Sequence, residues 1–173
     1  MKTKLFLSVI MTIALVACET DNGQERLTSA PEGVQMVDLG LSVKWANMNV
    51  GANKPEDNGD YFAWGETKPK AEYAWAAYNW CQGSSETLTK YCIHSEYGYN
   101  GFTDEMTVLA LEDDAAHVNW GGDWRMPTKA EQDELRTGCN WTWTDNWNGT
   151  RVKGYIVSSK TNDNSIFLPA AGS

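Results

Sequence analysis

Apolar and polar positions alternate over short stretches in the first half of the chain. Residues 34–46 alternate in this way on both sides of Gly40, and the pattern predicts two short strands. The apolar patch at 61–64 lies between turn-rich segments, which leaves a third strand or a packed loop open. Residues 71–80 contain good helix formers and predict one or two helical turns.

The segment 111–120 predicts a longer helix. Its three acidic residues fall in the first turn, where the helix dipole favours negative charge. Leu111, Ala115 and Val118 share one face, which we expect to be the buried one. The Gly-Gly pair that follows should end the helix.

A short joint connects this helix to the next. Thr128 stands three residues before Glu131, which is the spacing of a capping box, and Pro127 keeps the preceding residue extended. Gly138 offers the left-handed residue that ends many helices. The joint therefore predicts a second helix over about 129–137.

The chain changes to β structure after this helix. In the stretch 140–144, Trp141 and Trp143 point to one side of a strand. The stretches 151–159 and 165–170 flank a polar turn and predict a hairpin.

The order of these elements indicates the fold class. Two or three short helices beside small antiparallel sheets are typical of the α+β class, and residues 34–173 are long enough to form one domain with a core. The stretch 81–106 is rich in Gly, Ser and Tyr, and its aromatic residues favour an ordered loop over a linker.

The first 17 residues have the pattern of a secretory signal, because two lysines precede an apolar run too short to span a membrane. The run ends in Leu-Val-Ala-Cys, which resembles a bacterial lipobox and implies cleavage before Cys18 and lipid attachment to it. The alternatives are a soluble secreted protein or an uncleaved anchor. Residues 18–33 are polar and acidic and predict a flexible tether.

The expected location is the outer membrane of the cell envelope, with the lipid on Cys18 as the membrane anchor. Acidic residues just after Cys18 loosely resemble the surface-export signals of such lipoproteins, which favours exposure at the cell surface.

The net charge of −9 would become −11 after cleavage, because 12 basic and 23 acidic residues remain. So acidic a surface repels phosphate backbones, which argues against nucleic acid as a partner.

Three cysteines remain after cleavage. A bridge between Cys81 and Cys92 would close a short loop and add about 3 kcal/mol. The alternative is that these two residues and Cys139 are buried or unpaired thiols. The sequence leaves both alternatives open.

Four motifs follow one another along the chain, and they are VDLGLSVKWANMNVGA, GDYFAWGETKPK, LEDDAAHVNWGGDWRMPTKAE and NSIFLPAAG. Together they resemble the Fibrobacter succinogenes major paralogous domain, a family found in surface lipoproteins of Bacteroidetes. The resemblance runs from about residue 36 to 172 and implies a C-type-lectin-like fold related to formylglycine-generating enzymes. It implies no general activity, and some relatives are ligand-binding or adhesive surface proteins.

Two departures from the family pattern lead to predictions. The family usually has Trp at Gln132, which shares a helical face with Leu135, so we expect Gln132→Trp to raise the melting temperature. The family also continues past Gly172 into closing strands. The resemblance therefore implies a domain that is incomplete at its C-terminus, with an opening strand at a sheet edge and with low stability for residues 19–173.

The chain contains nine tryptophans, which is many for its length. Aromatic faces stack on sugars, and the alternative is that tryptophan fills a core poor in Leu and Ile. Four tryptophans lie in the family motifs and are predicted to be core residues: Trp45, Trp64, Trp120 and Trp124. The candidates for a ligand-binding surface are Trp75, Trp80, Trp141, Trp143 and Trp147.

No pattern singles out a metal centre, a cofactor site or a catalytic pair. Asp113 and His117 are four residues apart, a spacing that suits a shared metal, but a third ligand in register is missing and Asp113 serves the helix dipole equally well. The calcium-binding tripeptides of sugar-binding C-type lectins are absent from the sequence. We therefore expect no metal, no cofactor and no enzymatic activity.

The leading hypothesis is a lipid-anchored envelope protein whose non-catalytic domain binds a glycan or a surface protein. The alternative is a structural or fimbria-associated surface domain without a small ligand. A relative of the formylglycine-generating oxidoreductases is a remote third hypothesis, because the reactive cysteines of those enzymes would lie beyond Ser173.

Overall fold

The computed structural model describes Leu15–Val16 and residues 30–171. The predicted lipidation site Cys18, most of the predicted signal and most of the predicted tether lie outside the described residues. The predictions for them therefore remain predictions.

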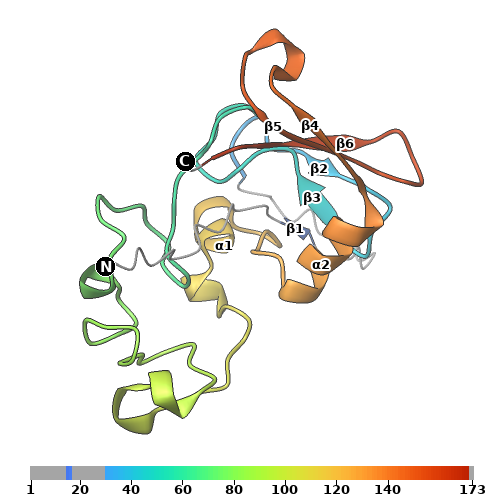
Figure 1. Ribbon diagram of the computed structural model, residues 1–173. Coiled ribbons are helices and arrows are strands. Elements are labelled where there is room, and N and C mark those ends of the chain that lie inside the picture. The colour runs from blue at the N-terminus through green and yellow to red at the C-terminus, as the bar shows by residue number, and fades with distance from the viewer. Residues whose placement is uncertain (1–14, 17–29, 172–173) are drawn as a thin grey trace.

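Two small antiparallel sheets and two short α-helices form the main body of the molecule (Figure 1). The first sheet has the order β1–β3–β2 and the second the order β4–β5–β6. This mixed arrangement, with small antiparallel sheets and few helices, is compatible with the predicted α+β class. The strands are β1 (Leu15–Val16), β2 (Met36–Val37), β3 (Lys44–Ala46), β4 (Asn140–Thr144), β5 (Gly154–Ser158) and β6 (Ser165–Pro169), and the α-helices are α1 (Ala115–Trp120) and α2 (Lys129–Gly138).

Short 3-10 helices occupy the connecting segments. They are η1 (Trp75–Ala77), η2 (Ser95–Tyr97), η3 (Tyr99–Gly101), η4 (Leu111–Asp113) and η5 (Trp147–Gly149).

The predicted strands are confirmed. β2 and β3 pair with Val37 opposite Trp45, and β5 and β6 form the predicted hairpin with Val157 opposite Ile166. The patch at 61–64 is a packed loop and not a strand. Of the helical turns predicted at 71–80, the structure contains η1.

β1 belongs to the predicted signal segment. It pairs antiparallel with β3, with Leu15 opposite Trp45, and β2 occupies the other edge of the sheet, where the opening strand was expected. Cleavage before Cys18 would leave β3 paired with β2 alone.

The helix predicted over 111–120 is in fact two helices. η4 ends at Asp113, and Asp114 is the N-cap of α1, where its side chain accepts hydrogen bonds from the backbone N–H groups of Ala116 and His117. Because the chain begins a new helix at this cap, the predicted face is wrong at two of its three residues: Leu111 and Val118 are about half exposed, whereas Ala115 is buried. α1 ends as predicted, because the residue after it, Gly121, is left-handed (φ 67°).

α2 begins with the predicted capping box of Thr128 and Glu131. Its last residue, Gly138, is not left-handed, so the expected reason for a glycine there is wrong. A Cβ at this position would lie 2.7 Å from Cδ2 of Leu41, so a larger residue there would require the end of the Leu41 side chain to shift.

Gln132 does not lie in the core. It is exposed and donates a hydrogen bond to the carbonyl of Pro127 at 3.5 Å, whereas Leu135 is buried on the same helix. The expected rise in melting temperature for Gln132→Trp therefore loses its physical basis.

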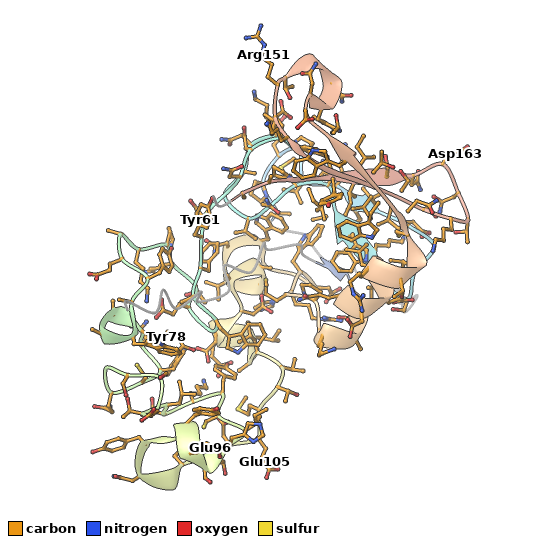
Figure 2. All side chains as sticks on the ribbon, viewed as in Figure 1. Tyr61, Tyr78, Glu96, Glu105, Arg151 and Asp163 are labelled. Atoms are coloured by element: carbon orange, nitrogen blue, oxygen red, sulfur yellow. The ribbon has the colours of Figure 1, made fainter. Side chains whose placement is uncertain are left out.

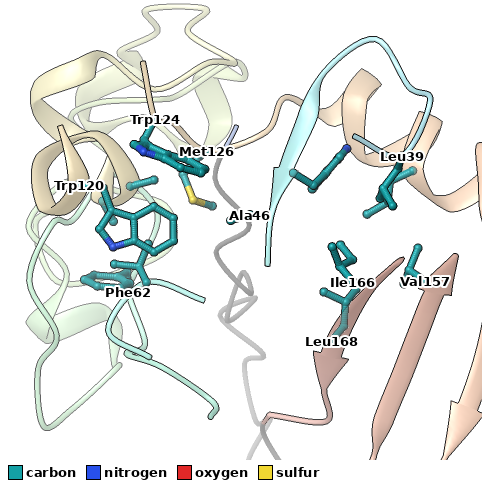
Figure 3. Close-up of a cluster of buried hydrophobic side chains, with 14 of the residues drawn as sticks. Leu39, Ala46, Phe62, Trp120, Trp124, Met126, Val157, Ile166 and Leu168 are labelled. Carbon is teal, nitrogen blue, oxygen red and sulfur yellow. The ribbon is translucent and has the colours of Figure 1, made fainter. Parts of the chain in front are cut away.

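One apolar core connects the two sheets and the two helices. Figure 3 shows Trp120 and Trp124 on one side of Ala46 and Ile166 and Val157 on the other. The indole N–H groups of Trp45 and Trp124 are buried and have no hydrogen-bond partner among the described residues. The core consists of Leu39, Trp45, Ala46, Val50, Phe62, Ala115, Ala116, Trp120, Trp124, Met126, Leu135, Cys139, Val157, Ile166 and Leu168.

Residues 63–108 form a second region, which we term the loop lobe, and the other residues of 30–171 form the sheet body. In Figure 1 the loop lobe is the green and yellow part beside α1, and in Figure 2 it contains Tyr78, Glu96 and Glu105. Its small buried cluster is Ala63, Tyr78 and Cys81. The lobe contains the predicted ordered loop at 81–106.

Candidate functional site

Three aromatic side chains come together on one face of the second sheet. Trp143 lies opposite Tyr155 and Trp141 lies opposite Val157 in the pairing of β4 with β5. Because residues two apart in a strand share a face, the rings continue the core-facing side of the sheet towards the edge strand β4. We refer to Trp141, Trp143 and Tyr155 as the aromatic surface.

The rings of the aromatic surface contact one another edge to face. The centroid of Tyr155 is 5.5 Å from that of Trp141 and 5.0 Å from that of Trp143, with interplanar angles of 71° and 72°. The exposed fractions are 37% for Trp141, 46% for Trp143 and 42% for Tyr155. Large aromatic side chains grouped on a surface in this way are typical of contact sites.

Polar groups border the aromatic surface. Trp143 donates its indole N–H to Oδ1 of Asp145 at 3.2 Å, and Nζ of Lys153 lies 3.7 Å from the same carboxylate oxygen. Trp141 donates to the carbonyl of Leu135 at 3.3 Å. A ligand on this surface would therefore meet apolar ring faces beside one carboxylate and one ammonium group.

The other predicted surface tryptophans lie elsewhere. Trp147 is stacked on Phe167, with centroids 4.7 Å apart and an interplanar angle of 16°. Trp75 packs edge to face on Tyr78 in the loop lobe, and Trp80 donates to the carbonyl of Gly65 at 2.7 Å. The structure thus groups Trp141 and Trp143 on one exposed surface, whereas Trp75 and Trp80 both pack against the buried cluster of the loop lobe.

Tyr155 was not among the predicted site residues. It lies in the stretch 151–159, which the sequence predicts as one strand of a hairpin, but no local pattern indicates that this strand pairs with 140–144. With that pairing, the register would have placed Tyr155 opposite Trp143.

The predicted core tryptophans are confirmed at three of four positions. Trp45, Trp120 and Trp124 are buried, and Trp120 and Trp124 contact each other edge to face at 5.0 Å. Trp64 is only half-buried and packs on Tyr91 in the loop lobe.

A polar cluster attaches the loop lobe to the sheet body. The buried carboxylate of Asp113 accepts hydrogen bonds from Nζ of Lys90 and from the hydroxyl of Tyr91, the latter at 2.6 Å. Burial and the hydrogen bond to Asp113 raise the pKa of Tyr91, and the hydrogen bond to Asp113 raises the pKa of Lys90. Lys90 also lies 4.7 Å from the ring centroid of Trp80.

The backbone of this cluster is strained at Tyr91. Tyr91 is left-handed (φ 56°), and Asp104 accepts hydrogen bonds from the backbone N–H groups of Tyr91 at 2.7 Å and Cys92 at 2.9 Å. These bonds hold a conformation that non-glycine residues rarely adopt. All of the cluster's polar groups are thus engaged within the protein, so it is explained as a structural feature.

A second ion pair is buried inside the loop lobe. Glu66 is 5% exposed and lies 2.6 Å from Nζ of Lys70, and it also accepts a hydrogen bond from the backbone N–H of Asn79 at 2.8 Å. Burial, and then the nearby charge of Glu66, raise the pKa of Tyr78, whose hydroxyl donates to the carbonyl of Trp64 at 2.8 Å.

The bridge between Cys81 and Cys92 is not formed in the structure, which shows the alternative of buried thiols. The sulfur of Cys81 donates to the carbonyl of Trp75 at 3.1 Å, and that of Cys92 donates to the carbonyl of His94 at 3.2 Å. Cys139 is buried as predicted, and burial raises the pKa of its thiol. A raised thiol pKa disfavours the thiolate that nucleophilic chemistry needs.

Asp113 and His117 do not share a site. Asp113 binds Lys90 and Tyr91, whereas Nδ1 of His117 lies 3.3 Å from the carbonyl of Trp124. Within residues 30–171 no group of three or more His, Cys, Asp and Glu side chains is arranged to hold a metal ion.

A small hollow lies between the loop lobe and the sheet body. It is open to solvent, has a volume of about 270 Å³ that includes this open space, and is lined by Phe62, Trp64, Glu66, Leu109 and Met126, among others. The enclosed part of this hollow has room for about one water molecule, whereas a small ligand needs a much larger pocket with several convergent polar groups. Here the carboxylate of Glu66 is already paired with Lys70, so the hollow is a weaker candidate than the aromatic surface.

Among the helices that the structure describes, none has the length and apolar composition needed to cross a membrane. Comparisons of the chain with protein-family models, with curated proteins and with solved structures gave no match. The geometry of the aromatic surface therefore carries the functional interpretation.

Proposed function

We propose that this chain is a lipid-anchored protein of the cell envelope whose domain, of the C-type-lectin-like class, binds a glycan without catalysis. The lipid would be attached to Cys18 and would anchor the protein in the outer membrane. The proposal rests on the resemblance of the sequence motifs and on one structural observation: the three half-exposed rings of the aromatic surface.

Glycan binding suits the chemistry of this surface. The C–H face of a sugar ring is apolar and packs on an aromatic face, whereas its hydroxyl groups need hydrogen-bond partners. The carboxylate of Asp145 and the ammonium group of Lys153 stand beside Trp143 and offer an acceptor and a donor. Tyrosine and tryptophan also combine an apolar body with a polar tip, which suits a partly hydrated contact.

The test is glycan-array screening of the full chain, followed by titration calorimetry with any glycan retained. We expect Trp143→Ala and Tyr155→Ala to weaken binding by at least about fivefold, because a stacked aromatic ring contributes on the order of 1–3 kcal/mol. Trp147→Ala is the matched control, since Trp147 stacks on Phe167 away from this surface. Absence of any retained glycan, or equal losses at Trp143 and Trp147, would contradict the proposal.

A second candidate function is a surface domain that contacts another protein and has no small ligand. The edge-to-face arrangement favours it, since rings inclined at 71° and 72° do not form one flat platform. Tyrosine and tryptophan are also enriched in protein interfaces. A protein ligand captured on cells, with loss of capture in Trp143→Ala and no glycan binding, would favour this candidate.

A further inference from the structure

The edge strands of the two sheets differ in how well they are protected against pairing with another chain. β2 is only two residues long, and β6 contains Pro169, which lacks a backbone donor. β4 has five residues, Asn140–Thr144, and contains neither proline nor a charged residue. Long, uncharged edge strands are the ones that pair with other chains.

The hydrogen-bond register identifies the backbone groups of β4 that point away from the sheet. Ala170 donates to the carbonyl of Lys153 at 2.8 Å, so the odd-numbered residues of β5 bond to β6 and the even-numbered ones bond to β4. Thr142 lies opposite Ile156 and therefore bonds inward. The N–H and C=O groups of Trp141 and Trp143 point outward, and no strand among residues 30–171 pairs with them.

We propose that β4 pairs in antiparallel orientation with β4 of a second copy of this chain, around a two-fold axis at Thr142. In this register Trp141 of one copy lies opposite Trp143 of the other, and the outward N–H and C=O groups of these two residues bond to each other. The two Thr142 side chains meet at the axis. Aromatic pairs and threonine pairs are both favourable cross-strand combinations, so the strand is complementary to itself.

The charge distribution allows this contact. The chain carries a net charge of −9, so two copies repel over most of their surfaces, but β4 has no charge. Antiparallel pairing brings Asp145, just after β4, towards the partner's segment before β4. Nζ of Lys160 lies there and donates to the carbonyl of Thr137 at 2.7 Å, and Glu134 is also near that segment. The approach of Asp145 to the partner's Lys160 thus offsets part of the repulsion between the two copies.

The expected dimer is weak. Five residues per strand and three half-exposed rings cover less than the roughly 800 Å² per partner of a stable interface, so we expect a dissociation constant of roughly 10–1000 μM. Pairing would also join the two aromatic surfaces into one continuous face, because Trp141 and Trp143 of the two copies lie side by side.

Charge at the two-fold axis tests the proposal. Thr142 is exposed and its side chain lies on the opposite face from the aromatic surface, so Thr142→Lys and Thr142→Glu leave that surface intact. We expect sedimentation of the full chain over a concentration series to show dimerisation weakened at least about fivefold in each variant, because like charges then stand directly opposite. Mixing the two variants should restore dimerisation through opposite charges.

A control pair and a second pair of variants separate the loss of strand pairing from other effects of the substitutions. Thr103→Lys and Thr103→Glu introduce the same charges at an exposed position of the loop lobe and should leave dimerisation unchanged. Trp143→Pro removes an outward N–H, whereas Trp143→Thr removes only the ring, so proline should weaken the dimer more.

The proposal is overturned if the chain is monomeric at about 1 mM, a concentration at which a dimer with this affinity is populated. It is also overturned if both Thr142 variants dimerise as the unmodified chain does. Glycan binding measured on the monomeric Thr142→Lys variant tests the proposed function separately.

Discussion

The sheet body and the loop lobe are stabilised in different ways. In the sheet body, β3, both α-helices and the second sheet contribute large apolar side chains to one core. In the loop lobe, only Ala63, Tyr78 and Cys81 are buried together, and tyrosine and tryptophan side chains instead donate to backbone carbonyls, as Trp80 does to Gly65.

The difference shows how one chain can order a region that has little regular structure. Apolar burial contributes about 25 cal/mol per Å² and needs no particular geometry, so it favours periodic strands and helices. Side-chain hydrogen bonds contribute only about 0.5–1.5 kcal/mol each, but they can satisfy backbone groups in irregular segments. We therefore expect the sheet body to determine global stability and the loop lobe to open locally at lower cost.

Truncation of Trp45 should have the largest effect. Its side chain is fully buried in the main core, so Trp45→Ala should lower the free energy of unfolding by about 3–5 kcal/mol through lost burial and a cavity. Denaturant unfolding followed by circular dichroism measures this change. Trp80→Ala in the loop lobe is the comparison. An equal loss of unfolding free energy in this variant would show that the two regions do not differ in their contribution to global stability.

Removal of Asp114 should have the next largest effect. Its carboxylate caps α1 and also accepts a hydrogen bond from the backbone N–H of Met126 at 2.8 Å, so it connects the helix to the joint. Asp114→Ala should cost about 2–3 kcal/mol, since it removes a cap and leaves a buried donor unpaired. Thermal unfolding measures the loss. Asp114→Asn keeps an acceptor for the cap, and a loss as large as that of alanine would argue against the capping role.

Acid should weaken the joint at α2. The hydrogen bond from Arg125, helped by those from Thr128, lowers the pKa of Glu131 from 4.5 to about 2. A lowered pKa contributes stability above the unfolded value, so this contribution is present above pH 4.5 and is lost as the pH falls from 4.5 towards 2.

Because the pair with Arg125 is partly exposed to solvent, we expect the loss at Glu131 to be about 1–2 kcal/mol. Unfolding measured from pH 7 to pH 2 should show a steeper decline for the unmodified chain than for Glu131→Gln, which lacks the titrating group. Parallel curves for the two chains would show that Glu131 contributes nothing to the acid response.

The smallest effect should come from Tyr91. Tyr91→Phe removes the hydroxyl that donates to Asp113 and should cost about 1 kcal/mol. We expect amide hydrogen exchange to accelerate in residues 63–108 and to stay unchanged in the second sheet. Faster exchange in β5 as well would show that the lobe and the body unfold as one unit.

The strands and the capping box that begins α2 could be predicted from the sequence, whereas the break between η4 and α1 and the place of Gln132 could not. Trp141 and Trp143 alternate with polar residues along β4, and the polar turn between two apolar runs indicates the hairpin of β5 and β6. The break at Asp114 was missed because three successive acids at 112–114 fit a first helical turn as well as they fit a cap. Gln132 was assigned to the core by helical spacing, but the structure leaves it exposed.

The candidate site could be predicted only in part for a related reason. Alternation placed Trp141 and Trp143 on one side of a strand, which is a local property. The third ring, Tyr155, depends on which strand lies beside β4 and in which register, and neither follows from local pattern. The contacts that attach the loop lobe could not be predicted for the same reason. They join residues such as Tyr91 and Asp113, which are separated by a turn-rich segment.

The burial of the tryptophans provides the chain with its own optical reporters. Trp45 and Trp124 are 0% and 2% exposed, and their indole N–H groups have no acceptor among the described residues, so their fluorescence should be blue-shifted. Trp143, at 46% exposure, should emit at longer wavelength and be quenched readily by iodide. Binding of a ligand or of a second copy to the aromatic surface would therefore change the long-wavelength emission that iodide quenches. Unfolding of the core would instead change the blue-shifted emission of the buried tryptophans.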